Sequence, residues 1–204
     1  MEKKQKIGIM GGTFDPIHYG HLVTAEAARQ RFNLERVYFV PSGHPPHKQY
    51  RQVTSADHRL MLCILATVTN PHFIVSEIEI QRQGFSYTYD TVREFKQNLG
   101  LDIEIYFITG ADAVLEIMQW KNIHLLAEEC NFIAATRPGY HFDDFTKAAL
   151  LPDFIMKKIQ FMEVPALAIS STDVRKRVKA GESIRYLLPE TVEMYIRKNR
   201  LYLE

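Results

Sequence analysis

The sequence has few cysteines, only Cys63 and Cys130 in 204 residues. Each stands in an apolar stretch, so we expect buried thiols in a reducing compartment and no disulfide framework. The sequence also lacks any apolar run near the roughly 18 residues that a membrane span needs. The run at 7–10 is too short for the core of a signal peptide. These absences predict a cytoplasmic protein that is neither secreted nor membrane-spanning.

Charge of either sign is not in excess, because 25 Lys and Arg nearly balance 24 Asp and Glu. A broad basic surface for nucleic acid or for a membrane is therefore not expected, and any anion site must be built from few residues. The hydrophobic share of 46% is ordinary for a protein with a sizeable core. At this length we expect a single domain spanning 1–204, with 165–204 as a C-terminal helical subregion.

Short β-rich runs alternate with helical patterns along the whole chain. The expected strands are 6–10, 36–40, 73–80, 102–110, 131–136 and 158–164. The expected helices are 17–32, 55–69, 88–99, 111–128, 142–151, 171–179 and 189–199. This alternation predicts an α/β fold, a Rossmann-like, doubly wound and mostly parallel sheet with helices on both faces. The run at 73–80 alternates most cleanly, which favours an edge or antiparallel strand.

Several expected strands run into clusters of Gly, Pro or Ser, which are found at 10–16, 40–48, 108–112, 135–139 and 164–172. In an open α/β sheet, ligands bind outside the carboxyl ends of the strands. We therefore expect the informative residues to meet at one edge of the sheet.

The segment GGTFDPIHYGH, residues 11–21, joins the first expected strand to the first helix. Gly11 and Gly12 let backbone N–H groups approach a ligand closely, which favours a phosphate-binding loop. The segment is neither a dinucleotide fingerprint nor a P-loop, because the required glycines and the Gly-Lys-Ser/Thr sequence are missing. Asp15 and Pro16 are expected to be the N-cap and the first residue of the helix.

Two histidines of this segment, His18 and His21, are three residues apart and so project on one side of a helix. Both imidazoles can face one ligand at the positive end of the helix dipole, and Gly20 leaves space for a bulky group across the helix. An ordinary histidine pKa of about 6.5 leaves much of the population neutral at pH 7, but a nearby phosphate favours the charged form. A surface pair or half of a metal site is the alternative, although no cysteine or carboxylate partner stands nearby. We favour donors to phosphoryl oxygens.

A second informative segment, ISSTDVR, spans residues 169–175. With GGTFDPIHYGH it resembles the HxGH-type nucleotidyltransferases, a family with a Rossmann-like sheet that moves a nucleotidyl group from a nucleoside triphosphate. ISSTDVR is similar to the ISSTxxR motif of that family. Two motifs in this order, about 150 residues apart, are far more specific than either alone.

Within that family, the whole chain from Lys6 to Leu203 is similar to the bacterial nicotinate-nucleotide adenylyltransferases. Further segments carry this resemblance: PPHK at 45–48, SYT at 86–88, GAD at 110–112, Trp120 and RPG at 137–139. The resemblance implies that ATP and nicotinate mononucleotide form deamido-NAD and pyrophosphate in NAD biosynthesis, with Mg²⁺ bound to the triphosphate. ATP and the mononucleotide are the expected partners, nucleic acid and membrane are not, and a homo-oligomer is left open.

The resemblance also implies a role for each matching residue. The expected ATP-binding residues are Gly11, Gly12, Thr13, Phe14, His18, His21, Gly110, Asp112, Ile169, Ser171, Thr172 and Arg175. The expected catalytic residues are His18, His21, Lys48 and Arg175. The expected mononucleotide-binding residues are Lys48, Thr88, Trp120 and Arg137. None of these residues is expected to be a metal ligand.

The chemistry of the cationic residues fits these roles. Lys48, on a loop stiffened by prolines, is a point charge that can meet the triphosphate, and its alternative is an ordinary solvated lysine. Arg175 is expected one turn into a helix opened by Ser171 or Thr172, where it can grip the β- and γ-phosphates together with free N–H groups. Arg137 is a phosphate ligand or a structural ion pair.

The expected pyridine and ribose contacts each have a structural alternative. Trp120 offers an indole face to a flat pyridinium cation, or it is partial core. Thr88 stands at the expected start of a helix, where it reads the nicotinate carboxylate or merely caps the helix. Asp112 accepts hydrogen bonds from ribose hydroxyls, or it is the N-cap residue of a helix.

The implied nucleophile is the 5′-phosphate of the mononucleotide, which is anionic at pH 7 and needs no general base. The protein then has to position two anionic substrates in line and stabilise the developing charge. A direct displacement without a covalent enzyme intermediate is therefore expected.

Other functions remain as rivals. The same motifs serve sibling enzymes that act on phosphopantetheine, on a phosphorylated polyol or preferentially on nicotinamide mononucleotide. The contexts of Thr88, Asp112 and Trp120 favour a pyridine nucleotide. A non-catalytic nucleotide sensor has no need for the imidazoles and cations together. A tRNA synthetase needs an anticodon-reading domain for which the chain lacks room, and it needs a broad basic patch.

Overall fold

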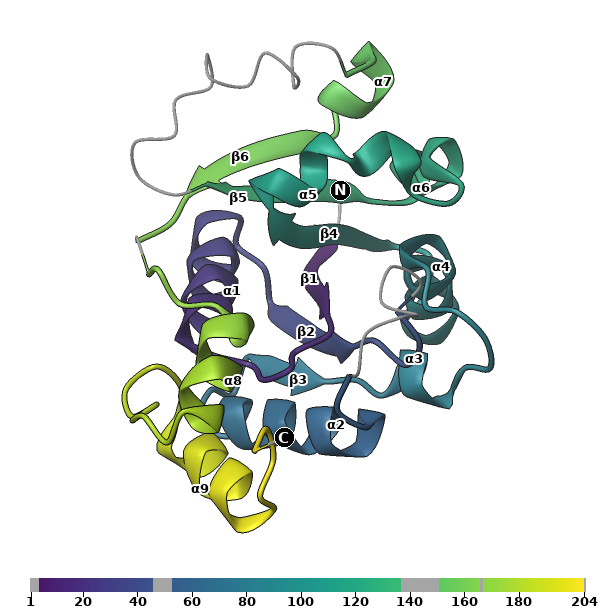
Figure 1. Cartoon of the computed structure of the whole chain (residues 1–204). Coiled ribbons are helices and arrows are strands. Elements are labelled where there is room, and N and C mark those ends of the chain that lie inside the picture. The colour runs from purple at the N-terminus through teal and green to yellow at the C-terminus, as the bar shows by residue number, and fades with distance from the viewer. Residues whose placement is uncertain (1–3, 46–52, 137–150, 166, 204) are drawn as a thin grey trace.

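The computed structural model describes residues 4–45, 53–136, 151–165 and 167–203. These residues contain a single parallel sheet with the strand order β3-β2-β1-β4-β5-β6 (Figure 1). The strands are β1 (Gln5–Gly12), β2 (Arg36–Pro41), β3 (Phe73–Val75), β4 (Ile103–Gly110), β5 (Asn131–Thr136) and β6 (Ile159–Glu163). The doubly wound α/β prediction is confirmed.

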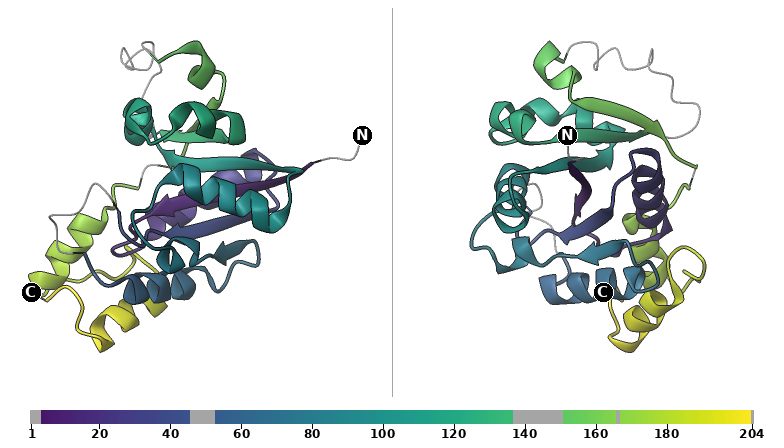
Figure 2. Two further views of the ribbon diagram at one scale, coloured as in Figure 1. Left: turned by 90° about the vertical axis from the view of Figure 1, so that its right-hand side faces the viewer. Right: turned by 180° about the vertical axis from the view of Figure 1, so that it is seen from behind.

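Helices cover both faces of the sheet (Figures 1 and 2). They are α1 (Tyr19–Arg31), α2 (Ala56–Thr67), α3 (Ile78–Gln81), α4 (Thr88–Leu99), α5 (Ala111–Leu115), α6 (Ile123–Glu129), α7 (Asp153–Met156), α8 (Ser171–Lys179) and α9 (Glu190–Lys198), with a 3-10 helix, η2 (Ile117–Gln119). One hydrophobic core joins the sheet to α1, α2, α8 and α9. A second core joins the opposite face to α3, α4, α5, η2, α6 and α7.

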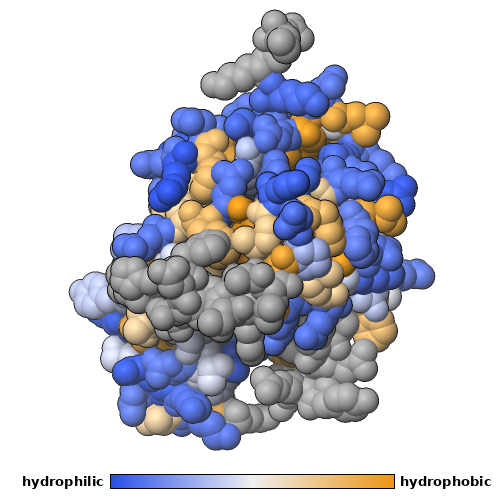
Figure 3. All heavy atoms as spheres, turned by 90° about the horizontal axis from the view of Figure 1, so that it is seen from above, coloured by the Kyte–Doolittle hydropathy of each residue, from blue (hydrophilic) through white to orange (hydrophobic). Residues whose placement is uncertain are grey.

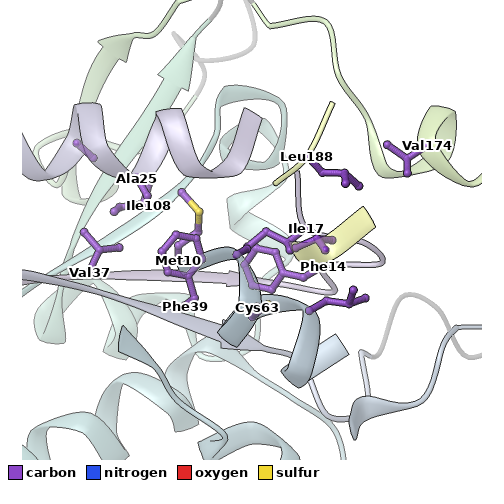
Figure 4. Packing of buried hydrophobic residues seen from close by; sticks show 14 of the residues in the cluster. Met10, Phe14, Ile17, Ala25, Val37, Phe39, Cys63, Ile108, Val174 and Leu188 are labelled. Carbon is purple, nitrogen blue, oxygen red and sulfur yellow. The ribbon is translucent and has the colours of Figure 1, made fainter. Parts of the chain in front are cut away.

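The alternation of side chains along β1 supplies both cores. Ile7 and Ile9 are buried in the second core, whereas Met10 is buried in the first. Figure 4 shows Met10 in the first core together with Phe14 and Ile17 from the loop that follows. Because helices cover both faces of the sheet, the strands are nearly continuous apolar runs. Full burial of one large apolar side chain stabilises the fold by about 1.5–3 kcal/mol.

The expected strand at 73–80 is corrected in length and direction. β3 covers only Phe73–Val75 and is an edge strand parallel to β2, so the antiparallel alternative was wrong. The chain then turns into α3, where Glu79 is buried and accepts a hydrogen bond from the Thr91 hydroxyl at 2.6 Å. The alternating pattern of this run therefore spans the end of a strand and the start of a short helix, in which Ile78 and Glu79 are both buried.

The expected helix at 111–128 is broken into α5, η2 and α6. Trp120 has extended backbone angles, and Asn122 adopts a left-handed conformation with φ 57°. Helical spacing persists on both sides of the break, which is why the periodicity missed it. The expected helix at 142–151 lies almost wholly outside the described residues, and α7 follows it.

Both cysteines are buried free thiols, as expected. Burial raises the pKa of the Cys130 thiol to about 12. No helix among the described residues is long and apolar enough to cross a membrane. Seen from the β6 side, the surface is polar with small groups of apolar residues between (Figure 3).

Candidate active site

Two pockets open at the carboxyl ends of β1 and β4, the neighbouring central strands at which the strand order reverses. Doubly wound sheets bind ligands at this switch point. The pockets have volumes of about 350 and 450 Å³, and both are lined by Gly11 and Thr109. They therefore adjoin over the ends of the two central strands.

The pockets differ in their chemistry. The expected site residues that line the first pocket are Gly11, His18, His21, Gly110, Asp112 and Ile169. Those that line the second are Gly11, Gly12, Thr13, Thr88 and Trp120. The structure thus places half of the expected ATP-binding residues in one pocket and the expected pyridine contacts Thr88 and Trp120 in the other, and the two pockets join at the glycine loop.

The start of α1 differs from the expectation. His18, with extended backbone, is the N-cap residue, and the helix begins at Tyr19. Asp15 and Pro16 therefore precede the helix and are neither its N-cap nor its first residue. The reason is long-range: Ile17 is fully buried, and the Asp15 carboxylate accepts hydrogen bonds from distant segments. Local sequence carries no signal for those contacts.

His18 and His21 lie against each other, as their spacing predicted. Their rings are stacked with centroids 3.8 Å apart. The backbone N–H of His18 donates to Nδ1 of His21 at 3.2 Å, so the proton of a neutral His21 ring is on Nε2. His21 Nε2–H is thereby set as a donor. The ring of Phe14 meets His21 edge-on at 5.1 Å and helps to fix its orientation.

Burial keeps both imidazoles neutral. It lowers the pKa of His18 to about 4, and burial together with the adjacent His18 lowers the pKa of His21 to about 3. His18 Nδ1 is buried, and among the described residues it has no hydrogen-bond partner. An anion in the first pocket would supply a partner and raise both pKa values, because opposite charge favours the protonated ring.

Gly20 lies between the His18 ring and the first pocket, which it lines. A Cβ at this position would lie 3.0 Å from both Cε1 and Nδ1 of His18. Part of the space beside Gly20 is therefore taken by the His18 ring. Glycine is needed here for close packing.

The second motif touches the first directly. Ile169 lines the first pocket, and its carbonyl oxygen would lie 3.8 Å from a Cβ on Gly20. Arg175 donates from Nη1 to the carbonyl oxygen of Asp15 at 2.6 Å. Two segments about 150 residues apart in the chain thus form one edge of the site.

The α8 residues of this motif hold the loop and do not line either pocket. The Ser171 hydroxyl donates to the carbonyl oxygen of Pro16 at 2.8 Å, and Arg175 Nη2 donates to the Thr172 hydroxyl at 3.3 Å. The N-cap is Ser170, whose hydroxyl accepts from the backbone of Asp173 at 3.1 Å. The helix begins at Ser171 as expected, but its capping residue is Ser170 and not Ser171 or Thr172.

Trp120 is partly packed in the core and partly exposed in a pocket wall. Its ring meets Phe107 and Phe132 edge-on at 5.6 and 6.2 Å, yet Trp120 is half-buried and lines the second pocket. Thr88 is the first residue of α4 and also lines this pocket, while Tyr87 is the N-cap residue. Capping by Thr88 is thus not its role.

Four further expected residues are Phe14, which lines neither pocket, Lys48 and Arg137, and Asp112 in the wall of the first pocket. The Phe14 side chain is 3% exposed and belongs to the first core, with its backbone at φ 50°. Lys48 and Arg137 lie outside the described residues. The expected N-cap alternative for Asp112 is wrong, because Gly110 is the N-cap residue of α5.

Sequence reasoning missed several residues of the second pocket. The Ser42 hydroxyl is buried there and, among the described residues, has no partner. Glu79 is buried in the pocket wall, and burial raises its pKa. The ammonium of Lys121 lies 4.1 Å from the Tyr87 ring centroid. Ser42 belongs to the Gly, Pro and Ser cluster at 40–48, which predicted a place at the ligand-binding edge of the sheet. Lys121 lies in the break between η2 and α6, which the local sequence did not indicate.

The expected magnesium ion is one that ATP would bring with it. Within the described ranges, no group of three or more His, Cys, Asp or Glu residues could hold a metal ion. Magnesium is usually bound through one or two carboxylates together with substrate phosphates and water. Asp112 is the carboxylate residue in the wall of the first pocket.

Comparison with known proteins identifies the family. The profile of the cytidylyltransferase-like family matches residues 9–177. A protein of Moorella thermoacetica, named a probable nicotinate-nucleotide adenylyltransferase, is 58% identical over 97% of this chain and 91% of its own length. A Thermoanaerobacter protein with the same name is 56% identical over 99% of this chain and 96% of its own. The chain belongs to the nicotinate-nucleotide adenylyltransferases of this family.

Solved structures of other proteins share the fold. The nicotinic acid mononucleotide adenylyltransferase of Plasmodium falciparum, complexed with NaAD, has a TM-score of 0.78 and is 23% identical, with 97% of each chain covered. The same protein complexed with APC has a TM-score of 0.75 at the same coverage. The resemblance drawn from the two motifs is confirmed.

Proposed function

We propose that the protein transfers the adenylyl group of ATP to the phosphate of nicotinate mononucleotide. The products are nicotinate adenine dinucleotide and pyrophosphate. One observation carries this proposal: the two adjoining pockets share Gly11 and Thr109, with paired imidazoles in one and an indole in the other. Two substrates that react through their phosphates need this arrangement, since their organic halves lie apart while their phosphates meet.

The first pocket suits ATP. Asp112 and Ile169 lie where an adenosine moiety fits, and Asp112 can accept from ribose hydroxyls. Gly11 supplies a backbone that a phosphate can approach closely. His18 and His21 bring neutral N–H donors to the same wall, beside the shared edge of the two pockets.

The second pocket suits the mononucleotide. Trp120 offers a ring face to the pyridinium, an interaction of about 0.5–2 kcal/mol. Thr88 begins α4, whose free N–H groups and helix dipole favour the nicotinate carboxylate over an amide. Lys121 adds a cation to the same wall. Together these features favour the acid over the amide.

The chemistry is an in-line displacement. The phosphate of the mononucleotide is the nucleophile, so the protein only has to align it with the α-phosphorus of ATP and stabilise the charge on the departing pyrophosphate. His18 and His21 are the preorganised donors for this charge. Lys48 and Arg175 are the cations we assign to the phosphates. Magnesium bound with ATP neutralises part of the triphosphate charge.

The experiment mixes purified protein, ATP and Mg²⁺ with one acceptor at a time: nicotinate mononucleotide, nicotinamide mononucleotide or phosphopantetheine. Mass spectrometry identifies the product, and a coupled assay follows pyrophosphate. Nicotinate adenine dinucleotide should form fastest. Faster reaction with either other acceptor would replace the proposed substrate, and pyrophosphate release from none of the three would remove the activity.

The direct displacement has its own test. ATP labelled in the α-phosphate, incubated with the protein alone, should leave no radioactivity on the denatured chain. Chiral α-thio-ATP should give a product with inverted configuration at phosphorus, since one displacement inverts once. Retention of configuration would establish a covalent intermediate.

A further inference from the structure

The segment that contains His18 and leads into α1, residues 13–18, is tied to distant parts of the chain through Asp15. This residue is 5% exposed. Its Oδ1 accepts from the Tyr202 hydroxyl at 2.8 Å, and its Oδ2 accepts from the backbone N–H of Thr54 at 3.4 Å. Its carbonyl oxygen accepts from Arg175. Three residues before His18, the chain is therefore held from α8, from the approach to α2 and from the C-terminal tail.

Tyr202 reaches Asp15 from the tail that follows α9. The tail turns back toward α2 (Figure 1), and the backbone N–H of Leu201 donates to Ile196 at 3.0 Å. The Tyr202 ring packs against the first core. Burial, with the nearby Asp15 charge, raises the pKa of Tyr202, so its hydroxyl keeps the proton that it donates.

A buried cation holds the segments next to the same carboxylate. Arg59 is 1% exposed and donates to the carbonyl oxygens of Thr54, Thr13 and Gly43 at 2.8, 2.9 and 3.3 Å. Burial lowers the pKa of Arg59, and the Asp15 charge opposes that shift. Arg59 thus fixes the backbone of Thr13, two residues before Asp15, and of Thr54, whose N–H donates to Asp15.

We propose that Tyr202 is a positioning residue for the imidazoles. Since α1 begins only at Tyr19 and its first hydrogen bonds are accepted by the carbonyl oxygen of His18, helical hydrogen bonds do not restrain residues 13–17. The Tyr202 hydroxyl, through Asp15, holds this segment so that His18 and His21 stay stacked at the wall of the first pocket. The C-terminal tail therefore completes the active site without touching a substrate. The kinetic part of the test rests on the proposed function.

The test compares two hydroxyl deletions in the same subregion. Tyr202→Phe removes the hydrogen bond to Asp15, while the backbone contact of Tyr19 with Leu187 at 3.0 Å still docks the subregion. Tyr195→Phe is the matched control, because the Tyr195 hydroxyl makes one hydrogen bond, at 2.9 Å, to His58 on α2. We expect kcat of Tyr202→Phe to fall about tenfold with KM values within about twofold, since one hydrogen bond to a charged group is lost. Tyr195→Phe should keep kcat within about twofold.

A second readout needs no substrate. Histidine resonances of His18 and His21, assigned by substitution, are titrated by NMR in all three proteins. Both rings in Tyr195→Phe should titrate as in the unaltered protein, near the low pKa values of about 4 and about 3. In Tyr202→Phe the pKa values should move toward the ordinary value of about 6.5, because the loosened segment exposes the rings.

Unchanged kcat and unchanged titration in Tyr202→Phe would overturn the proposal. Equal effects in both variants would overturn it too, since the contact would then be one of general stability. If the unaltered protein forms no dinucleotide, the proposed function fails, and the titration still decides the role of Tyr202.

Discussion

The imidazoles of His18 and His21 owe their state to neighbours that do not take part in catalysis. Phe14 orients one ring, Gly20 makes room for the other, and burial keeps both uncharged. A neutral imidazole already offers an N–H donor. The ring takes up a second proton, and with it a positive charge, only when an anion approaches. Under the proposed function, the pair would therefore interact more strongly with the charged transition state than with water.

Replacing either imidazole tests this role. His18→Ala and His21→Ala should each lower kcat by about 10² to 10³, the loss found for one preorganised donor. Initial rates of dinucleotide formation measure it, and thermal melting checks that the variants fold. Near-normal turnover in both variants would remove the histidines from the catalytic machinery.

Gly20→Ala separates stability from activity. An added Cβ would meet the His18 ring at 3.0 Å, so the ring must shift by a few tenths of an ångström. Alanine also favours the helix by up to about 1 kcal/mol. We expect an unchanged or higher melting temperature together with a kcat lowered about tenfold, since small misplacements are costly. An active, stabilised variant would show that the ring position does not matter.

Residue types at the site could be predicted, but their partners could not. His18, His21 and Asp112 were named from motifs and line the first pocket. Arg59, the buried cation beneath the site, was missed because its surroundings come from three loops. A single charged residue within a helical pattern gives no sign that it is buried.

Among the helices and strands, the interruption between η2 and α6 bears most on the proposed binding of the pyridine substrate. It presents Trp120 at the second pocket, while the flanking turns stay packed on the sheet. Helical periodicity continues across the break, so the sequence predicted one helix. By contrast, α4 and α8 were predicted with their observed bounds, because their apolar faces match single, uninterrupted helices.

The indole of Trp120 can be tested by substitution. Trp120→Ala should raise KM for nicotinate mononucleotide about tenfold and leave KM for ATP within about twofold, because the indole lines only the second pocket. Trp120→Phe keeps a ring against Phe107 and serves as the control, with a smaller rise. An equal rise in both KM values would show that Trp120 acts through the fold.

At the scale of the whole molecule, the two buried histidines make stability depend on pH. Their folded pKa values, about 4 and about 3, lie below the unfolded value of about 6.5. Between these values the unfolded chain binds more protons, so the free energy of unfolding should rise with pH from about 4 to about 6.5 and be lost as pH falls.

The histidine contribution can be isolated by comparing variants. Urea unfolding at pH 5 and pH 7 should show a smaller pH dependence in His21→Gln than in the unaltered protein. The control is His44→Gln, whose side chain is exposed. An unchanged pH dependence in His21→Gln would contradict the burial of its ring.

The parallel, doubly wound sheet was predicted from the alternation of strands and helices, and its strand order brings the carboxyl ends of β1 and β4 together. What sequence could not give is the division of that edge into two pockets, since the walls come from segments far apart in the chain. The central claim is that these pockets hold the two halves of one product.

A crystal structure with nicotinate adenine dinucleotide tests that claim most directly. We expect the adenine half to bind in the pocket of Asp112, the pyridine half to bind against Trp120, and the diphosphate to lie over Gly11 and Thr109. A dinucleotide lying wholly in one pocket, or bound away from the ends of β1 and β4, would contradict it.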